Sequence, residues 1–223
     1  MKNINQQIIK FNHDINLSKD NFFISKSNKN IFDFMNKWPR WEKNFINIVG
    51  ERFSGKTHLI SIFVKKYKGL KIESKSLNEY HLKEIKLHEN IILEDMDKKV
   101  DEKLFYTLYN IIEQDNKFLI ITSTNPITKI NFDLQDLRSR SRTFILQNID
   151  KPDDELIFAL LLKNFSDRQI FLEKKFIDFI IKRIDRSYGK IFDFIYKIDE
   201  MSLKKKKPIN FKIIQEVLGG ETE

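Results

Sequence analysis

The chain has 223 residues, enough for one domain with an appendage or for two small domains. Its hydrophobic share of 41% and charged share of 32% are those of a folded protein with a very polar surface, which excludes a chain that is disordered throughout. The absence of cysteine excludes a disulfide scaffold, a thiolate nucleophile and a zinc site built on sulfur. No apolar run approaches the roughly 20 residues of a membrane span, so we expect a cytoplasmic protein with no membrane partner.

The chain is basic, with 40 Lys and Arg residues against 32 Asp and Glu residues and a net charge of +8. Most of this excess lies before residue 150, where it would attract a nucleic acid, a nucleotide or an acidic protein surface. A modest excess of surface lysine also serves solubility alone. Charge by itself therefore leaves direct binding to nucleic acid open.

The order of the predicted elements indicates an α/β fold followed by helices alone. Residues 1–20 show no clear period and are expected to form an N-terminal tail. From residue 45 onward, short β-branched runs alternate with helical periods, which predicts a parallel sheet covered on both faces. After residue 150 only helical periods remain, apart from a polar stretch at 202–208 that is predicted to be a loop. The predicted strands are 45–49, 70–73, 91–95, 118–122 and 143–146, and the predicted helices are 28–38 (ended by Pro39), 56–67, 104–113, 156–165, 175–184, 191–201 and 211–218.

One segment carries a specific chemical signature. Residues 50–57 fit the pattern G-x-x-x-x-G-K-[ST], with a predicted strand before them and a helix after them. In such a phosphate-binding loop, backbone N–H groups turn inward around the phosphates and the helix N-terminus adds its dipole. Lys56 is predicted to reach the β- and γ-phosphates and Thr57 to ligate Mg²⁺, so ATP or ADP with Mg²⁺ is the expected cofactor. The predicted nucleotide-binding residues are Gly50, Glu51, Arg52, Phe53, Ser54, Gly55, Lys56, Thr57 and His58.

Carboxylates and hydroxyls end two further predicted strands. Glu94 and Asp95 close the strand at 91–95, an arrangement that delivers acids to the metal and to the attacking water in phosphoryl-transfer proteins. Glu94 is predicted to support Mg²⁺ and Asp95 to polarise the nucleophile, in an order that reverses the usual Asp-Glu. Thr124, just after the strand at 118–122, is predicted to hydrogen-bond the γ-phosphate or the water, with a plain polar exit from the strand as the alternative.

Three guanidinium groups, of Arg138, Arg140 and Arg142, alternate just before the last predicted strand. An arginine supplied by a neighbouring subunit can stabilise charge in the transition state of phosphoryl transfer. An ordinary cluster of surface charge is the alternative.

Together these motifs resemble the AAA+ module of the bacterial replication initiator DnaA, and most closely its shortened paralogue Hda. Residues 21–28 are similar to the family's segment that packs near the adenine, and residues 102–110 with 120–126 are similar to its sensor I region. Residues 134–140 resemble the Asp-Leu-x-Ser-Arg segment, which implies that Arg140 is an arginine finger acting in trans. The resemblance implies a P-loop AAA+ core with a five-stranded parallel sheet at 21–149 and a small all-helical lid domain at 150–223.

Two departures from DnaA shape the expected function. The chain ends at Glu223 without room for a helix-turn-helix domain, so we do not expect it to read an origin sequence. Gly189 stands where the sensor II helix of DnaA carries an arginine, with Lys190 and Arg186 as neighbouring candidates for that role. Weak or partner-dependent ATPase activity is therefore expected.

The N-terminal tail holds a second resemblance. Gln6, Ile9 and Phe11 are similar to the Gln-x-x-Leu-x-Phe/Leu peptide with which Hda-like proteins dock on the DNA polymerase sliding clamp. A plain disordered tail is the alternative. The implied partners are DnaA, the sliding clamp and DNA indirectly through the clamp, and assembly into a homo-oligomer is left open.

The resemblance implies a regulator that promotes hydrolysis of DnaA-bound ATP and so limits replication initiation. Two other classes share the motifs: an AAA+ helicase loader, which does not need the tail peptide, and a stand-alone P-loop ATPase, which would turn over without a partner.

Overall fold

The computed structural model describes residues 21–97, 99–205 and 209–219. Its centre is a five-stranded sheet in the order β2-β3-β4-β1-β5, in which every neighbouring pair is parallel. This confirms the predicted α/β fold with a five-stranded parallel sheet. The predicted tail, with Gln6, Ile9 and Phe11, lies outside the described residues. The strands are β1 (Phe45–Val49), β2 (Leu70–Glu73), β3 (Asn90–Glu94), β4 (Phe118–Ser123) and β5 (Ile145–Asn148).

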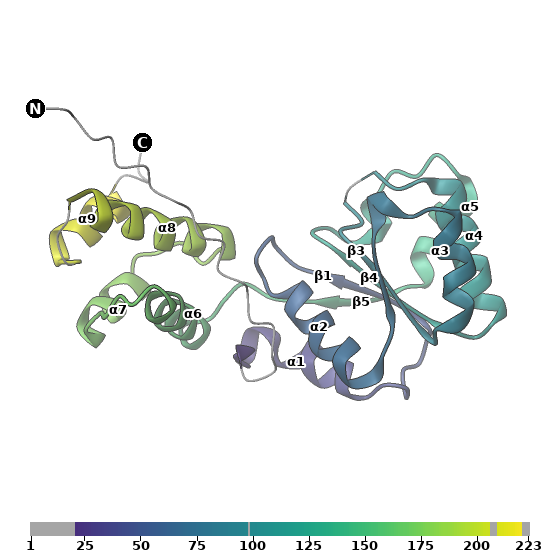
Figure 1. The fold of residues 1–223 in the computed structure, drawn as a ribbon, viewed down its shortest axis with the longest axis horizontal. Coiled ribbons are helices and arrows are strands. Elements are labelled where there is room, and N and C mark those ends of the chain that lie inside the picture. The colour runs from purple at the N-terminus through teal and green to yellow at the C-terminus, as the bar shows by residue number, and fades with distance from the viewer. Residues whose placement is uncertain (1–20, 98, 206–208, 220–223) are drawn as a thin grey trace, which may run out of the picture.

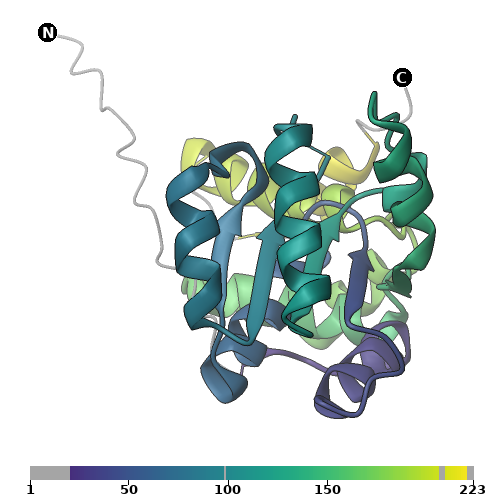
Figure 2. The ribbon, with the colours of Figure 1, turned by 90° about the vertical axis from the view of Figure 1, so that its right-hand side faces the viewer.

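Helices cover both faces of the sheet (Figures 1 and 2), which explains why the three inner strands β1, β3 and β4 are buried along their whole length. On β3, Ile92 packs in one hydrophobic cluster with Leu59 of the phosphate-loop helix, whereas Ile91 packs in another with Phe105. Successive side chains of a strand point to opposite faces, so these clusters mark the two sides of the sheet. The first face carries α1 (Lys26–Asn36) and α2 (Lys56–Tyr67), and the second carries α3 (Glu79–Glu84), α4 (Glu102–Gln114) and α5 (Gln135–Arg140).

The helices after β5 build a third hydrophobic cluster of their own at one end of the molecule (Figure 1). Apolar side chains from all four helices meet there, including the fully buried Leu161, Ile180, Phe194 and Ile214. Within the part of the chain that the structure describes, no helix is long and apolar enough to cross a membrane. The four helices are α6 (Asp154–Asp167), α7 (Lys174–Ile181), α8 (Tyr188–Lys205) and α9 (Phe211–Gly219), and we call them the C-terminal helical unit.

One carboxylate joins this unit to the core. Asp153 caps α6 by accepting a hydrogen bond from the Leu156 amide at 2.8 Å, and its other oxygen accepts one from the Ser27 amide at the start of α1, at 3.1 Å. Partial burial alone would raise the pKa of Asp153, but hydrogen bonds from Leu156, Ser25 and Ser27 hold it below its usual value. The connection from β5 to α6 is therefore fixed against α1.

Several predicted bounds differ from the structure, and three of these differences have a local cause or consequence. Asp95 was placed in a strand, but β3 ends at Glu94 and Asp95 has a left-handed φ of 58°. The strand predicted at 143–146 begins two residues later, because the Thr143 hydroxyl donates to the Arg140 carbonyl at 2.8 Å in a 3-10 turn over Ser141–Thr143. The loop predicted from 202 begins later as well, since α8 continues to Lys205.

Candidate functional site

The predicted phosphate loop joins β1 to α2 with the backbone that such a loop requires. Gly55 has a φ of 93°, a left-handed conformation that favours glycine. A Cβ on Gly50 would stand 2.6 Å from the Ser54 hydroxyl and 3.2 Å from Ile149 Cβ, so the close packing of the loop also needs a glycine there. The buried Ser54 Oγ has no hydrogen-bond partner among the described residues, which leaves a donor available inside the loop.

Lys56 lies in the centre of this loop. Its Nζ donates hydrogen bonds to the carbonyl oxygens of Gly50 at 2.6 Å and Glu51 at 2.8 Å. Burial lowers the pKa of the Lys56 ammonium, and the negative charges of Asp97, Asp95 and Glu51 oppose that effect. Among the described residues, this buried cation donates its hydrogen bonds to neutral carbonyls, which it can exchange for the anionic oxygens of a phosphate.

The carboxylates beside the loop divide into two groups. Asp95 and Asp97 act electrostatically on Lys56. Glu94 lies on the same face of the sheet as α2, and its Oε2 pairs with Lys71 Nζ of β2 at 3.1 Å. The other oxygen of Glu94, Oε1, is buried and has no hydrogen-bond partner among the described residues. Lys71 and Asp97 are site residues that the sequence analysis missed.

The residues present fit a bound nucleotide better than they fit a metal held by protein alone. No group of three or more His, Asp or Glu side chains in the described residues is placed to hold a metal ion. The exposed Thr57 and the unpaired Oε1 of Glu94 are the protein oxygens available to Mg²⁺, and phosphate oxygens and water would have to supply the rest.

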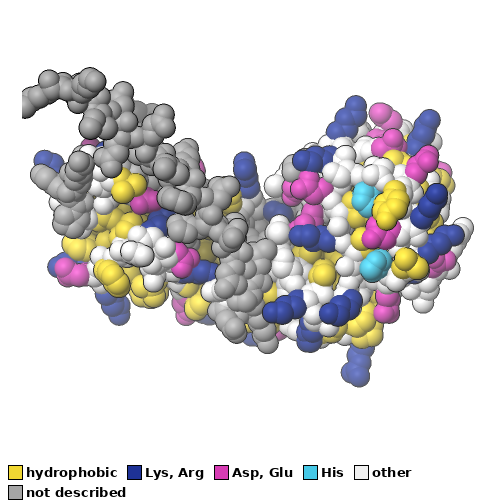
Figure 3. Space-filling model, in the orientation of Figure 1, with side chains coloured by type: hydrophobic (Ala, Val, Ile, Leu, Met, Phe, Trp, Pro, Cys, Tyr) yellow, Lys and Arg dark blue, Asp and Glu magenta, His cyan; other side chains and the backbone are white. Residues whose placement is uncertain are grey.

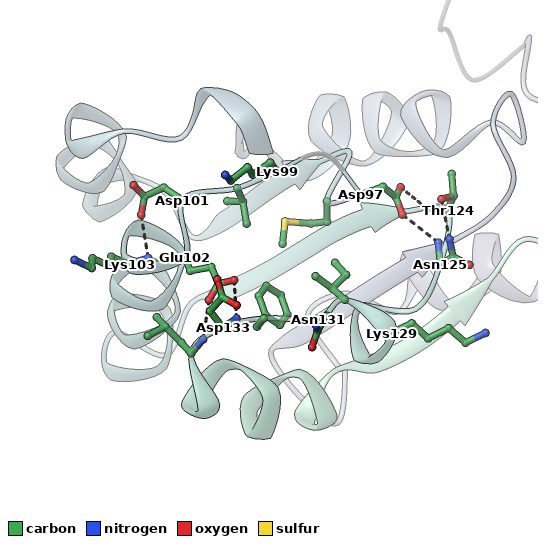
Figure 4. A pocket seen from close by; sticks show the side chains of 15 residues that line it. Asp97, Lys99, Asp101, Glu102, Lys103, Thr124, Asn125, Lys129, Asn131 and Asp133 are labelled. Atoms are coloured by element: carbon green, nitrogen blue, oxygen red, sulfur yellow. Dashed lines mark hydrogen bonds between the residues drawn. The ribbon is translucent and has the colours of Figure 1, made fainter.

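Asp97 and Thr124 meet where the β3–α4 and β4–α5 connections face each other (Figure 4). The Asp97 carboxylate accepts hydrogen bonds from the amide of Thr124 at 2.6 Å and from that of Asn125 at 3.3 Å. The Asp95 amide donates to the Thr122 hydroxyl at 3.1 Å, which ties the two strand ends together. Asp97, Thr124 and Asn125 border a groove of about 1050 Å³, whose lining residues come from these two connections and the start of α4 and include none of the phosphate loop.

A buried asparagine fixes this edge of the sheet. Asn47 of β1 is fully buried; its Nδ2 donates to Ser123 Oγ at 2.8 Å and its Oδ1 accepts the Ile127 amide at 2.8 Å. One side chain thus joins β1, the end of β4 and the turn that follows. Asn47 therefore fixes the position of the segment after β4, which includes Thr124 and Asn125.

Asn47→Ala is expected to lower the free energy of unfolding by about 2 to 3 kcal/mol, because it leaves the buried Ile127 amide and the Ser123 hydroxyl without partners. Urea denaturation followed by circular dichroism measures the loss. The matched control is Asn44→Ala, which removes an exposed hydrogen bond to Asn116 and should cost much less. Equal losses in the two variants would contradict this role for Asn47.

The segment before α1 reaches the phosphate loop. The Phe22 ring packs edge-on against the His58 ring, with centroids 5.1 Å apart, and stacks on Phe32. A Cβ at Gly55 would lie 3.5 Å from Phe22, so the ring is in contact range of the loop itself. The structure thus brings Phe22, from the segment before α1, and His58 together beside the loop.

The C-terminal helical unit also contacts the phosphate loop. The Glu51 carboxylate accepts hydrogen bonds from Ser187 Oγ at 2.9 Å and from the Tyr188 amide at 3.1 Å, and the exposed Phe53 ring packs on Phe192 with centroids 5.1 Å apart. Of the neighbouring candidates for the sensor II role, Arg186 pairs with Asp154 at 2.7 Å rather than with the loop. Gly189 lies at the start of the same helix and brings no side chain to the site.

Arg140 lies far from this loop in the fold. Arg140 is the last residue of α5 and precedes the turn that leads into β5. The parallel strands β5 and β1 begin side by side, so Arg140 lies near the amino ends of these strands, whereas the phosphate loop follows the carboxyl end of β1. The Arg140 guanidinium lies over the Tyr109 ring at 4.5 Å and donates to Glu113 Oε2 at 2.8 Å. Burial lowers the pKa of Arg140, but the bond and charge of Glu113 outweigh it and raise the pKa. Arg138 donates to the Phe132 carbonyl, and Arg142 is exposed.

The surface charge forms no single basic patch on the face seen in Figure 3. Lys and Arg side chains are interspersed with Asp and Glu side chains over the core. Such mixing is typical of a surface that serves solubility.

Known proteins that resemble this chain include replication initiators. No protein-family model matches the chain. The chromosomal replication initiator protein DnaA of Borreliella afzelii is 26% identical over 236 residues, which covers 92% of this chain and 48% of that protein. An uncharacterized protein of Haemophilus influenzae is 23% identical over 187 residues, covering 78% of this chain and 81% of that protein. The chain spans about half the length of the DnaA proteins it matches.

Solved structures show the same fold. Domain III of the Thermotoga maritima replication initiation protein DnaA superposes with a TM-score of 0.72 at 20% identity, covering 93% of this chain and 97% of that one. AMPPCP-bound DnaA from Aquifex aeolicus superposes with a TM-score of 0.63 at 18% identity, covering 84% of this chain and 68% of that one. The chain is therefore similar in sequence to DnaA over about 90% of its length and shares the fold of DnaA domain III.

Proposed function

We propose that the chain is a nucleotide-binding AAA+ regulator of replication initiation that docks on the sliding clamp and promotes hydrolysis of ATP bound to DnaA. The observation that carries the proposal is a phosphate loop with a buried Lys56 in a chain that is similar in sequence to DnaA and shares the fold of DnaA domain III. The AMPPCP-bound DnaA structure supports a nucleotide as the ligand of that loop. Thr57 and Glu94 would hold Mg²⁺ together with the phosphates, and the metal would neutralise phosphate charge.

The placement of the charged groups supports action on a partner's nucleotide. Arg140 lies near the start of strands β5 and β1, whereas Lys56 follows the end of β1. This separation from the chain's own loop supports a role for Arg140 on a nucleotide held by another molecule. Turnover of the chain's own nucleotide has less support: Glu94 is paired with Lys71, and Gly189 offers no cation from α8. Asp95 and Thr124 remain the candidates for polarising water at the chain's own site, which we propose to be mainly structural.

The direct test is a hydrolysis assay on DnaA of the same organism loaded with labelled ATP. Conversion of bound ATP to ADP should accelerate only when the chain and clamp loaded on DNA are both present. The chain alone, with ATP in excess, provides the control for its own turnover. If the chain alone hydrolyses ATP as fast as the complete mixture with DnaA does, it is a stand-alone ATPase and the proposal is overturned.

Docking on the clamp gives a separate prediction. The double change Gln6→Ala and Phe11→Ala should abolish recovery of the chain on immobilised sliding clamp, because it removes the amide and one of the two apolar anchors of the peptide. Gln7→Ala, at a position that the pattern leaves unspecified, is the matched control and should bind like wild type. If wild type and a chain lacking residues 1–12 both fail to bind, the clamp is not the partner and the helicase-loader class is favoured.

A further inference from the structure

Three side chains of α4 surround the guanidinium of Arg140. Tyr106, Tyr109 and Glu113 follow one another at helical spacing, which places them on one side of α4. The guanidinium carbon of Arg140 lies 4.5 Å from the centre of the Tyr109 ring and 5.3 Å from that of the Tyr106 ring. Its Nη1 donates to Glu113 Oε2 at 2.8 Å. The two rings thus contact the body of the cation, whereas Glu113 binds one of its N–H groups.

Tyr109 is itself held in place by its surroundings. The side chain is only 2% exposed, and its ring stacks on Phe45 of β1 with centroids 4.1 Å apart. Its hydroxyl lies 3.0 Å from Thr143 Oγ1, and the Thr143 hydroxyl donates to the Arg140 carbonyl at 2.8 Å. Because Thr143 gives its single hydroxyl proton to that carbonyl, Tyr109 is the donor between the two hydroxyls. One tyrosine therefore contacts the side chain of Arg140 and, through Thr143, its backbone.

The Tyr109 ring and the Glu113 carboxylate respond differently to an approaching anion. The side chain of Arg140 is 27% exposed and that of Glu113 is 54% exposed, so solvent and other molecules reach this ion pair. A phosphate oxygen can replace the carboxylate, because both are anionic acceptors for the same N–H groups. The Tyr109 ring attracts the cation as a whole and takes up none of its hydrogen bonds, so this contact persists when Glu113 is replaced.

We propose that Tyr109 is a positioning residue for Arg140, which keeps the guanidinium in place while its N–H groups exchange Glu113 for a phosphate on another molecule. A long side chain loses rotamer freedom when it binds, and one that is already held against a ring loses less. Tyr109 therefore accelerates the step in which Arg140 stabilises charge, with little effect on the docking of the two proteins. The effect on hydrolysis rests on the proposed function of Arg140, whereas the order of its side chain does not.

Nitrogen relaxation of the arginine side chains tests the positioning in the chain alone. The Nε–H signal of Arg140, assigned by its loss in Arg140→Lys, should show a high heteronuclear NOE in wild type. Tyr109→Leu should lower this NOE to that of the exposed Arg142, whereas Tyr109→Phe, which keeps the ring, should leave it high. Phe105→Leu removes another buried ring from α4 and is the control, which should match wild type.

Thr143→Val tests the same point without altering the core, because Thr143 is exposed. It removes the bond to the Arg140 carbonyl and the acceptor of the Tyr109 hydroxyl, so the NOE of Arg140 should fall. Thr107→Val is the matched control, since it removes an exposed hydroxyl bond to the Lys103 carbonyl on α4. A wild-type signal of Arg140 as mobile as that of Arg142, or an equal change in a variant and its control, would overturn the positioning.

Hydrolysis of ATP on DnaA, with clamp loaded on DNA, tests the consequence for the reaction. Tyr109→Leu should lower the maximal rate about tenfold without raising the chain concentration needed for half-maximal stimulation, and Tyr109→Phe should stay within about twofold of wild type. Equal maximal rates for wild type and Tyr109→Leu, where Arg140→Ala abolishes stimulation, would refute a role of Tyr109 in the reaction. If Arg140→Ala leaves stimulation intact, the proposed function of Arg140 fails, and the relaxation data still decide whether Tyr109 positions its side chain.

Discussion

Lys56→Ala is expected to raise the dissociation constant for ADP with Mg²⁺ at least about 100-fold. The Lys56 ammonium is buried in the loop and bonded to the Gly50 and Glu51 carbonyls, so it is placed to exchange both bonds for phosphate oxygens. Hydrogen bonds to charged groups contribute roughly 1.5 to 3 kcal/mol each, and the loss of two of them corresponds to about two to four powers of ten in affinity. Isothermal titration calorimetry measures the change directly.

The matched control for this experiment is Lys65→Ala on the same helix. Lys65 is exposed, so its removal changes the net charge equally without touching the loop. Circular dichroism should show that Lys56→Ala stays folded, because the substitution removes a cation whose pKa burial already lowers. Dissociation constants within a few-fold of each other for Lys56→Ala and Lys65→Ala would show that the loop does not bind nucleotide through this lysine.

The elements around the loop could be predicted well because their signals are local. The bounds predicted for β1 and α2 match the structure, since a short apolar run, a glycine-bounded turn and a helical period follow one another without a gap. Strands buried on both faces also produce continuous apolar runs, which identified β3 and β4. The short helices α3 and α5 escaped prediction because six residues are too few to establish a helical period.

The contacts that complete the site could not be predicted, because they join residues distant in the sequence. Glu51 and Ser187 are 136 positions apart in the sequence, and no local sequence pattern around either residue predicts their hydrogen bond. Lys71 faces Glu94 only because β2 and β3 are neighbours in register, which requires the sheet order to be known. Asp97 had a usable signal, as a third acid within four residues after an apolar strand, but its bonds to the turn after β4 depend on the fold.

Arg140→Ala is expected to reduce the stimulation of DnaA-bound ATP hydrolysis to background without weakening the chain's own nucleotide binding. An arginine finger supplied in trans contributes about 10³ to 10⁵ in kcat, so its loss removes nearly the whole effect of the partner. The chain's own nucleotide affinity should be unchanged, because Arg140 lies near the amino ends of β1 and β5, whereas Lys56 follows the carboxyl end of β1. The assay is conversion of labelled ATP on DnaA in the presence of clamp loaded on DNA, with ADP titration in parallel.

Two matched variants distinguish a finger from a structural arginine. Arg142→Ala removes an exposed guanidinium two residues away and should leave stimulation intact. Arg140→Lys keeps the positive charge but loses the planar guanidinium with its paired donors, so this variant should remain defective in stimulation. Glu113→Gln weakens the ion pair that holds Arg140 against α4, and it should preserve stimulation if the guanidinium leaves Glu113 to reach a phosphate. Loss of stimulation in Arg142→Ala, or loss of ADP affinity in Arg140→Ala, would contradict the assignment, because either result would place the function of this arginine cluster elsewhere.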